Sequence, residues 1–169
     1  MDEDQIAKIA VFIPSIRNTF RGVLPKNQLP TNINNKECHS YILNYDKYGY
    51  PASHWVAFYI DHDHVFYFDS YGINPKVDPY IMNFANKCLR NKLFYSNIQL
   101  QSPVSSVCGL YCIYFLYIMN MKLYNFKDFV SLFDNNYKIN DYNILSNFKD
   151  IFVKLNMNEL YKSLYCNNS

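Results

Sequence analysis

The stretch HWVAFYIDHDHVFYFD, residues 54–69, decides the fold. It holds two runs rich in aromatic and β-branched residues, 54–60 and 64–69, on either side of the polar triplet Asp61-His62-Asp63. Two such runs joined by a short polar segment predict a β-hairpin.

The open end of this hairpin carries two groups that suit proton transfer. A two-residue loop at 61–62 would pair Ile60 with Asp63 and place His54 directly opposite Asp69 on the same face, with Cβ atoms about 5 Å apart. An imidazole beside a carboxylate is a general base with its orienting partner. The alternative is a surface pair without a function.

A second informative stretch is SSVCGLYC, residues 105–112. Cys108 follows a polar loop and begins a predicted helix that is apolar all round, runs to about Met121 and should therefore be buried. The positive end of the helix dipole favours a thiolate at Cys108, and the backbone N–H there is free to meet an oxyanion. Gly109 leaves space for a substrate backbone. The alternative is a buried structural cysteine, which fits Cys112 better.

Taken together, His54, Asp69 and Cys108 supply the base, the orienting group and the nucleophile of a covalent mechanism. Gln101 lies in the loop before the same helix, and its side-chain amide is a candidate second donor to the oxyanion. Gln99 is the alternative for that role.

The remaining pattern completes an α+β fold, a small mixed sheet packed on a buried central helix with further helices at both ends. We expect one domain over residues 1–169. The other expected elements are a helix over 4–13 ended by Pro14, a short strand over 41–43 within an irregular 20–53, a turn at 70–72, a helix over 78–92, a third strand over 95–100 and a helix capped by Asp141 with an apolar stripe from 144 to 155.

Composition excludes several classes of protein. With 169 residues and 50% hydrophobic content, the chain has enough apolar side chains for one core. A net charge of +2 without runs of like charge does not indicate a nucleic-acid binder. The 17 Tyr and 13 Phe are interpreted as packing residues rather than base-stacking platforms. No Gly-rich phosphate loop is present.

Neither a membrane nor a metal is indicated. The start MDEDQIAK is acidic where a signal peptide is basic. The longest apolar run, Cys108 to Met119, would cover only about 18 Å of the roughly 30 Å of hydrocarbon in a bilayer. Residues 61–64 alternate Asp and His, but we interpret them as a solvated turn, and Cys108-x3-Cys112 lacks a second ligand pair at zinc spacing. The five irregularly spaced cysteines are expected to be reduced, in a cytosolic or nuclear setting.

The ordered motifs resemble those of the adenain-like cysteine proteases, which include the adenovirus maturation protease and relatives in Polinton-type elements, adintoviruses and virophages. They are more distantly similar to SUMO-specific proteases. The matching pieces are His54-Trp55, Phe68-Asp69-Ser70-Tyr71-Gly72, Gln101 to Cys112 with Cys108-Gly109-Leu110 inside it, and more weakly Phe20 to Pro25.

This resemblance implies a cysteine endopeptidase fold and site. It assigns Cys108 as nucleophile, His54 as base, Asp69 as orienting residue and Gln101 as oxyanion donor. Trp55, together with Gly109, is expected to line the substrate site. Asp69 matches the SUMO-protease and Polinton versions, whereas adenain has Glu there. The implied role is cleavage of viral precursor proteins during particle maturation, after small residues such as Gly-Gly. A monomer acting in the host nucleus or cytoplasm and in the virion is expected.

Two activators belong to the same resemblance. Adenain is stimulated by DNA and by a short viral peptide held through a disulfide, and Cys88 lies near the position that accepts such a peptide. A core cysteine explains Cys88 equally well, and a net charge of +2 speaks against DNA activation. The chemistry itself requires no cofactor.

Two other functions remain open at this point. An isopeptidase that removes a ubiquitin-like protein would use every one of the same catalytic residues. The alternative that is not an enzyme is a catalytically silent capsid or DNA-binding module on a protease fold. The presence of His54, Asp69, Gln101 and Cys108 together argues against the silent module.

Overall fold

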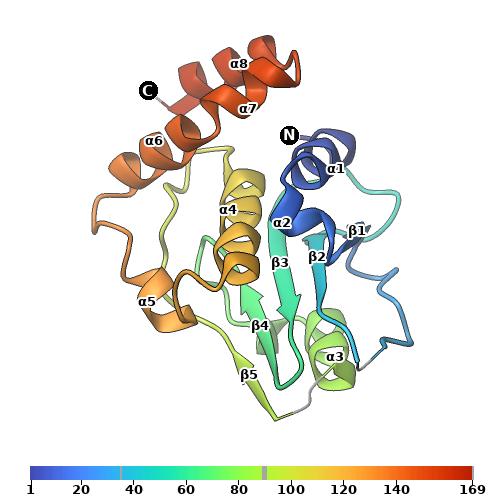
Figure 1. Cartoon of the computed structure of the whole chain (residues 1–169). Helices are drawn as coiled ribbons and strands as arrows, with labels where there is room; N and C mark the ends of the chain where they lie inside the picture. The colour runs from blue at the N-terminus through green and yellow to red at the C-terminus, as the bar shows by residue number, and fades with distance from the viewer. Residues whose placement is uncertain (35, 89–90, 169) are drawn as a thin grey trace.

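A five-stranded mixed sheet forms the centre of the chain in a computed structural model that describes residues 1–34, 36–88 and 91–168 (Figure 1). The outer pairs, β1 with β2 and β4 with β5, are parallel, and the two inner pairs are antiparallel. The strand order is that of the sequence. The strands are β1 (Phe20–Pro25), β2 (His39–Asn44), β3 (Trp55–Ile60), β4 (His64–Phe68) and β5 (Lys92–Phe94).

Helices cover both faces of this sheet, so the α+β prediction is confirmed. They are α1 (Glu3–Phe12), α2 (Pro14–Arg17), the 3-10 turn η1 (Pro75–Val77), α3 (Pro79–Cys88), α4 (Cys108–Met121), α5 (Phe126–Val130), α6 (Tyr137–Asn147), α7 (Lys149–Lys154) and α8 (Asn158–Asn168). One face packs against α3, and the other packs against α4 with the N- and C-terminal helices. Every residue of β2 and β3 is buried because each strand is covered on both sides.

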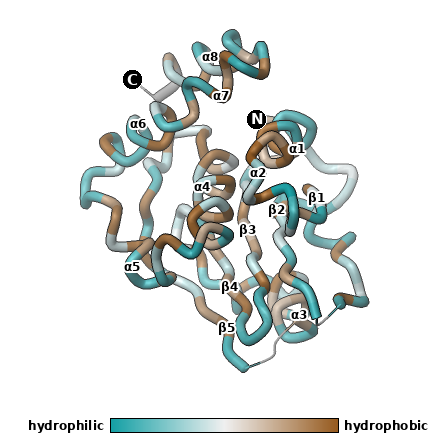
Figure 2. Tube along the Cα trace, in the orientation of Figure 1, coloured by the Kyte–Doolittle hydropathy of each residue, from teal (hydrophilic) through white to brown (hydrophobic). Residues whose placement is uncertain are grey.

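Helix α4 has the bounds that the sequence predicts, and most of its residues are buried and hydrophobic, as the brown stretches along it in Figure 2 indicate. Its Phe115 stacks on Phe68 of β4, with ring centroids 5.0 Å apart. Ile6 and Ile9 of α1, both fully buried, belong to the same core cluster. Gly109 allows close approach here, because a Cβ at this position would lie 2.9 Å from Ile6 Cδ1.

The predicted hairpin is present, but its register was wrong. Ile60 pairs with Val65 rather than with Asp63, and Asp61 N–H donates to the His64 carbonyl at 3.0 Å. The turn is thus centred one residue later than predicted. Asp61 explains the shift, because its carboxylate accepts the backbone N–H groups of both Asp63 and His64.

Other strand and helix predictions also need correction. The strand predicted over 95–100 was wrong. The strand that lies beside the hairpin is β5, which directly precedes that segment. The helix predicted over 78–92 is observed as α3, which ends at Cys88. The remainder of the predicted range includes residues 89–90, which lie outside the described residues. Strand β1 was missed within the segment taken as irregular, since its parallel edge position leaves it without a clear alternation.

Near the C-terminus, the predicted cap Asp141 is not a cap. Asn136 caps α6 by accepting from the N–H groups of Lys138 and Ile139, and Asp141 lies buried inside the helix. The apolar stripe over 144–155 is divided between α6 and α7 at Phe148.

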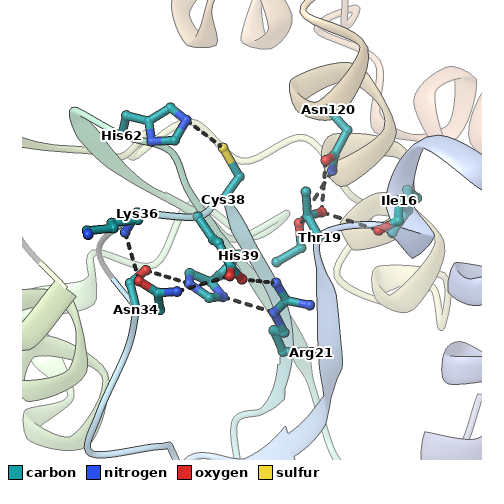
Figure 3. A network of polar contacts seen from close by, with 11 residues as sticks. Ile16, Thr19, Arg21, Asn34, Lys36, Cys38, His39, His62 and Asn120 are labelled. Carbon is teal, nitrogen blue, oxygen red and sulfur yellow. Dashed lines mark hydrogen bonds and ion pairs between the residues drawn. The ribbon is translucent and has the colours of Figure 1, made fainter.

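A polar network secures the start of β2 (Figure 3). The His39 ring accepts a hydrogen bond from Arg21 Nε at 3.0 Å, and its other nitrogen lies 2.8 Å from the Asn34 carbonyl. Thr19 Oγ1 donates to Asn120 Oδ1 of α4 at 2.8 Å. These contacts join the loop before β2 and the C-terminal part of α4 to the same end of the sheet.

Phe115 should be a main contributor to stability. Phe115→Ala removes a fully buried ring that contacts Phe68 and Phe129, so we expect a loss of about 3–5 kcal/mol in the free energy of unfolding. Urea unfolding followed by circular dichroism measures this change. Met121→Ala on the exposed end of the same helix is the control, and a comparable loss in both variants would contradict the packing argument.

Candidate active site

The open end of the hairpin brings His54 and Asp69 together. His54 Nε2 lies 2.9 Å from Asp69 Oδ1, and both side chains are buried. Because the corrected register keeps the same parity, the two side chains still share a face of the sheet, but they are diagonal rather than directly opposed. The Asp69 carboxylate also accepts Tyr71 N–H at 2.7 Å and Tyr67 O–H at 3.3 Å. These donors fix the carboxylate that orients the ring.

The electrostatic surroundings of His54 favour its protonated form. Burial alone would lower its pKa, but hydrogen bonding and charge attraction from Asp69 and from Cys108 outweigh burial and raise the pKa to about 9. Nε2 is therefore a donor to Asp69 at neutral pH. The other ring nitrogen, Nδ1, is buried and has no hydrogen bond of good geometry to any described group. It is therefore the ring nitrogen that can interact with Cys108.

Cys108 is the first residue of α4 and is 7% exposed. Figure 1 shows that α4 and β3 begin at the same end of the molecule. Hydrogen bonding and charge attraction from Cys108 contribute to the raised pKa of His54, so the two groups interact across these elements. The N–H groups of Cys108 and Gly109 belong to the first turn of the helix and have no intrahelical acceptor. No side chain caps this helix start. The site therefore offers a nucleophile beside a base, next to backbone donors and a positive helix end.

Cys112, one turn further along α4, is fully buried. Burial raises the pKa of its thiol well above the ordinary value. Cys112 is therefore the structural cysteine of the pair, as its position in the apolar helix predicts.

The loop before α4 places Gln101 beside the site, with its side chain fully buried. Its amide Nε2 donates to the carbonyl and to the hydroxyl of Ser105 at 3.0 and 2.9 Å, and Ser70 Oγ donates to its Oε1 at 2.7 Å. Gln99 instead turns its amide to the Gln101 carbonyl at 2.9 Å. Of the two candidates for the second oxyanion donor, Gln101 is the one held among the site residues.

Tyr71 is a site residue that sequence reasoning missed. Its ring stacks on His54 with centroids 4.6 Å apart, and its hydroxyl lies 3.3 Å from the Ser105 carbonyl and 3.4 Å from Gln101 Nε2. Burial raises its pKa, and the nearby Cys108, Asp141 and Asp69 add to the effect. The available signal was its place within Phe68-Asp69-Ser70-Tyr71-Gly72, two residues beyond the carboxylate.

Gly72 explains why that motif ends in glycine. Its φ is 70°, and a Cβ there would come within 2.7 Å of the backbone at Ile98. Only glycine tolerates both constraints. The tight turn lets the Ser70 carbonyl accept the N–H groups of Leu100 and Gln101, at 2.8 and 3.1 Å. The segment after Asp69 thereby holds the Gln101 loop in place.

The two residues expected to line the substrate site, Trp55 and Gly109, lie beneath the N-terminal segment in this structure. Trp55 is 3% exposed, and its indole N–H donates to the Met1 carbonyl at 3.2 Å. Gly109 is covered by Ile6. Both therefore have a packing role here, and their contact with a substrate stays a prediction.

Cys88, the residue considered for a disulfide with an activating peptide, is buried on α3 in the core beneath the sheet. An incoming peptide thiol would reach it only if α3 moved. Among the described residues, no three metal-ligating side chains form a cluster. Within the same part of the chain, no helix is long and apolar enough to span a bilayer.

Comparison with known proteins shows similarities to the following two proteins, among others. A protein of Acanthamoeba polyphaga mimivirus that is named as a thiol protease is 29% identical over 83 residues, which are 44% of this chain and 28% of the mimivirus protein. The chain thus matches less than a third of that relative's length. The crystal structure of the ASFV pS273R protease superposes with a TM-score of 0.42 and 21% identity, over 49% of this chain and 34% of the other. No protein-family model matches the chain.

The raised pKa of His54 predicts how stability depends on pH. A pKa of about 9 in the folded chain exceeds the ordinary 6.5, so the stabilising contribution is fully present below pH 6.5 and is lost as the pH rises through 9. We expect the free energy of unfolding to fall over this window, and to fall less in Asp69→Asn, which lacks the negative partner. Urea unfolding at several pH values measures both slopes. Asp63→Asn, on the exposed turn, should keep the wild-type slope, and equal slopes in all three proteins would contradict the assignment.

Proposed function

We propose that this chain is a cysteine protease in which Cys108 is the nucleophile. The observation that carries the proposal is a buried imidazole held by a carboxylate, on which the cysteine at the start of a long helix acts through hydrogen bonding and charge. The elevated pKa of His54, to which Cys108 contributes, supports a protonated imidazole beside the nucleophile. The sequence similarity to a viral protein named as a thiol protease supports the same chemistry.

The proposed mechanism assigns one role to each of these groups. The Cys108 sulfur attacks the scissile carbonyl carbon, and the oxyanion that forms is held by the Cys108 N–H and by Gln101. The His54 imidazolium then gives its proton to the leaving amine, the C–N bond breaks and a thioester remains. Neutral His54 next takes a proton from water, the resulting hydroxide equivalent attacks the thioester, and the free carboxylate and Cys108 are regenerated. Asp69 keeps the ring oriented throughout.

The finer part of the proposal concerns the substrate. The motif set resembles that of proteases that mature viral particles, and we propose that the chain cleaves viral precursor proteins after small residues such as Gly-Gly. Profiling against a peptide library and against conjugates of a ubiquitin-like protein separates this role from the isopeptidase alternative. Preference for the conjugates over all extended peptides would reverse the proposed substrate class.

Cys108→Ala should abolish peptide cleavage, because no other group in the site can form the thioester. The measurement is turnover of a Gly-Gly peptide found by profiling, with Cys112→Ala as the matched control on the same helix. Cys112→Ala should retain most activity because that thiol is fully buried. Cleavage that survives Cys108→Ala would refute the assignment.

Asp69→Ala should be less damaging than Cys108→Ala, because it removes the orientation and charge partner of the base rather than a reacting group. We expect kcat to fall about 10²- to 10⁴-fold, the range in which acid–base groups contribute. Steady-state kinetics on the same peptide measures this fall. A variant as inactive as Cys108→Ala would mean that Asp69 does more than orient the ring.

The ion pair can be tested without any substrate. Iodoacetamide should alkylate Cys108 rapidly near pH 5.5 in the wild type, and this rapid reaction should be absent in His54→Ala. Mass spectrometry locates the modified cysteine. Alkylation of Cys108 only near the ordinary thiol pKa of about 8.5 would contradict the proposed site.

A further inference from the structure

Tyr71 joins parts of the candidate active site that come from different elements. It lies in the turn directly after Asp69, where the Gly72 N–H donates to the Asp69 carbonyl at 3.0 Å. Its own backbone N–H donates to Asp69 Oδ1 at 2.7 Å, and this is the same oxygen that accepts from His54 Nε2. The backbone of Tyr71 is therefore tied to the carboxylate that holds the imidazole.

The side chain of Tyr71 is anchored at its other end as well. Its hydroxyl donates to the Ser105 carbonyl at 3.3 Å, and Ser105 belongs to the loop that leads into Cys108. Between these two anchors the phenol ring lies against the face of the His54 imidazole, with ring centroids 4.6 Å apart and an angle of 26° between the planes. Tyr71 thus extends from the carboxylate to the nucleophile loop across one face of the base.

This contact supplies a restraint that the carboxylate alone does not give. The hydrogen bond from His54 Nε2 to Asp69 leaves the imidazole able to turn about that bond, and Nδ1 has no hydrogen bond of good geometry among the described groups. A ring stacked on the imidazole restricts such rotation, because a large turn would drive the edge of the imidazole into the phenol. The Tyr45 ring is more distant, with centroids 6.1 Å apart, and is tilted by 48°, so it restrains the base less.

The same contact favours the charged form of the base. A cation close to the face of an aromatic ring is attracted by its π electrons, and the phenol of Tyr71 is neutral because burial raises its pKa. The titratable groups that face the imidazole are Asp69 after β4, Cys108 on α4, and the two tyrosines, Tyr45 and Tyr71. Asp69 and Cys108 both raise the pKa of His54, so the stacked ring acts in the same direction as these two groups.

We propose that Tyr71 is a positioning residue for the general base, whose stacked ring holds the His54 imidazole in the orientation that lets Nδ1 interact with Cys108. The inference rests on the proposed protease function and deepens it, because a ring contact then shares with Asp69 the task of orienting the base. The hydroxyl of Tyr71 has a separate role, which is to anchor the side chain to the loop before α4.

The test is the pH dependence of Cys108 alkylation by iodoacetamide, a reaction that needs no peptide substrate. Tyr71→Leu removes the ring but keeps an apolar side chain. We expect the pH at which the alkylation rate reaches half its maximum to rise by about one unit, because the cation–π contact and the restraint on the imidazole are lost together. The rate near pH 10, where a thiol ionises without help from a base, should stay that of the wild type.

Two further variants show whether the ring itself is responsible. Tyr71→Phe retains the stacked ring and should keep the wild-type profile. Tyr48→Leu, the same kind of change at a tyrosine that is 70% exposed, is the matched control and should leave the profile unchanged. A Tyr71→Leu profile that coincides with that of the wild type, or an equal shift in Tyr71→Phe, would overturn the inference.

Cys112 reports whether each variant is folded, because its thiol is fully buried and should stay unlabelled in the mass spectra. If Tyr71→Leu exposes Cys112, Tyr71→Met is measured in its place, with the same shift expected and its absence counting against the inference. Failure of the proposed function has a different signature. Cys108 of the wild-type chain would then react only near the ordinary thiol pKa of about 8.5, which would refute the protease assignment itself.

Discussion

Helix α4 imposes the main constraint on this structure, because it has no polar face and must be covered on every side. The sheet covers one side, α1 and α2 cover another, and the helices beyond residue 125 close the rest. Burial of such a helix is the main apolar contribution to the core. It also sets the position of Cys108, which is the first residue of this helix.

The site forms where two such constraints meet. The hairpin fixes His54 and Asp69 on one face through the parity of its register, and α4 brings the thiol to the same end of the sheet. The segment after Asp69 then connects the two parts, because the Ser70 carbonyl holds the start of the Gln101 loop and Gly72 permits the tight path. The base His54 and the nucleophile Cys108 are therefore held at the ends of regular elements, and the amide of Gln101 is held by the loop that leads into α4.

Local patterns predicted the parts of this arrangement that depend on neighbouring residues. The bounds of α4 follow from a continuous apolar run after a polar loop, and the hairpin and the shared face of His54 and Asp69 follow from the composition and alternation of two strands. The register did not, because the Asp61 carboxylate moves the turn by one residue. Strand β1 was missed and β5 was misplaced because short parallel edges are defined by their partners rather than by their own alternation. Contacts such as Tyr71 on His54 join segments that a sequence pattern does not relate.

Asp141 is a second residue whose environment the local sequence pattern did not predict. At the sequence level it looked like a helix cap, a role that would leave it exposed at low cost, yet it is buried inside α6 without a cation among the described residues. Replacement of a buried charge by an apolar group of similar size is often neutral or stabilising. Here the carboxylate accepts hydrogen bonds from Tyr111 O–H and Ser102 N–H, which offset the cost of burial and join α6 to α4 and to the loop before it.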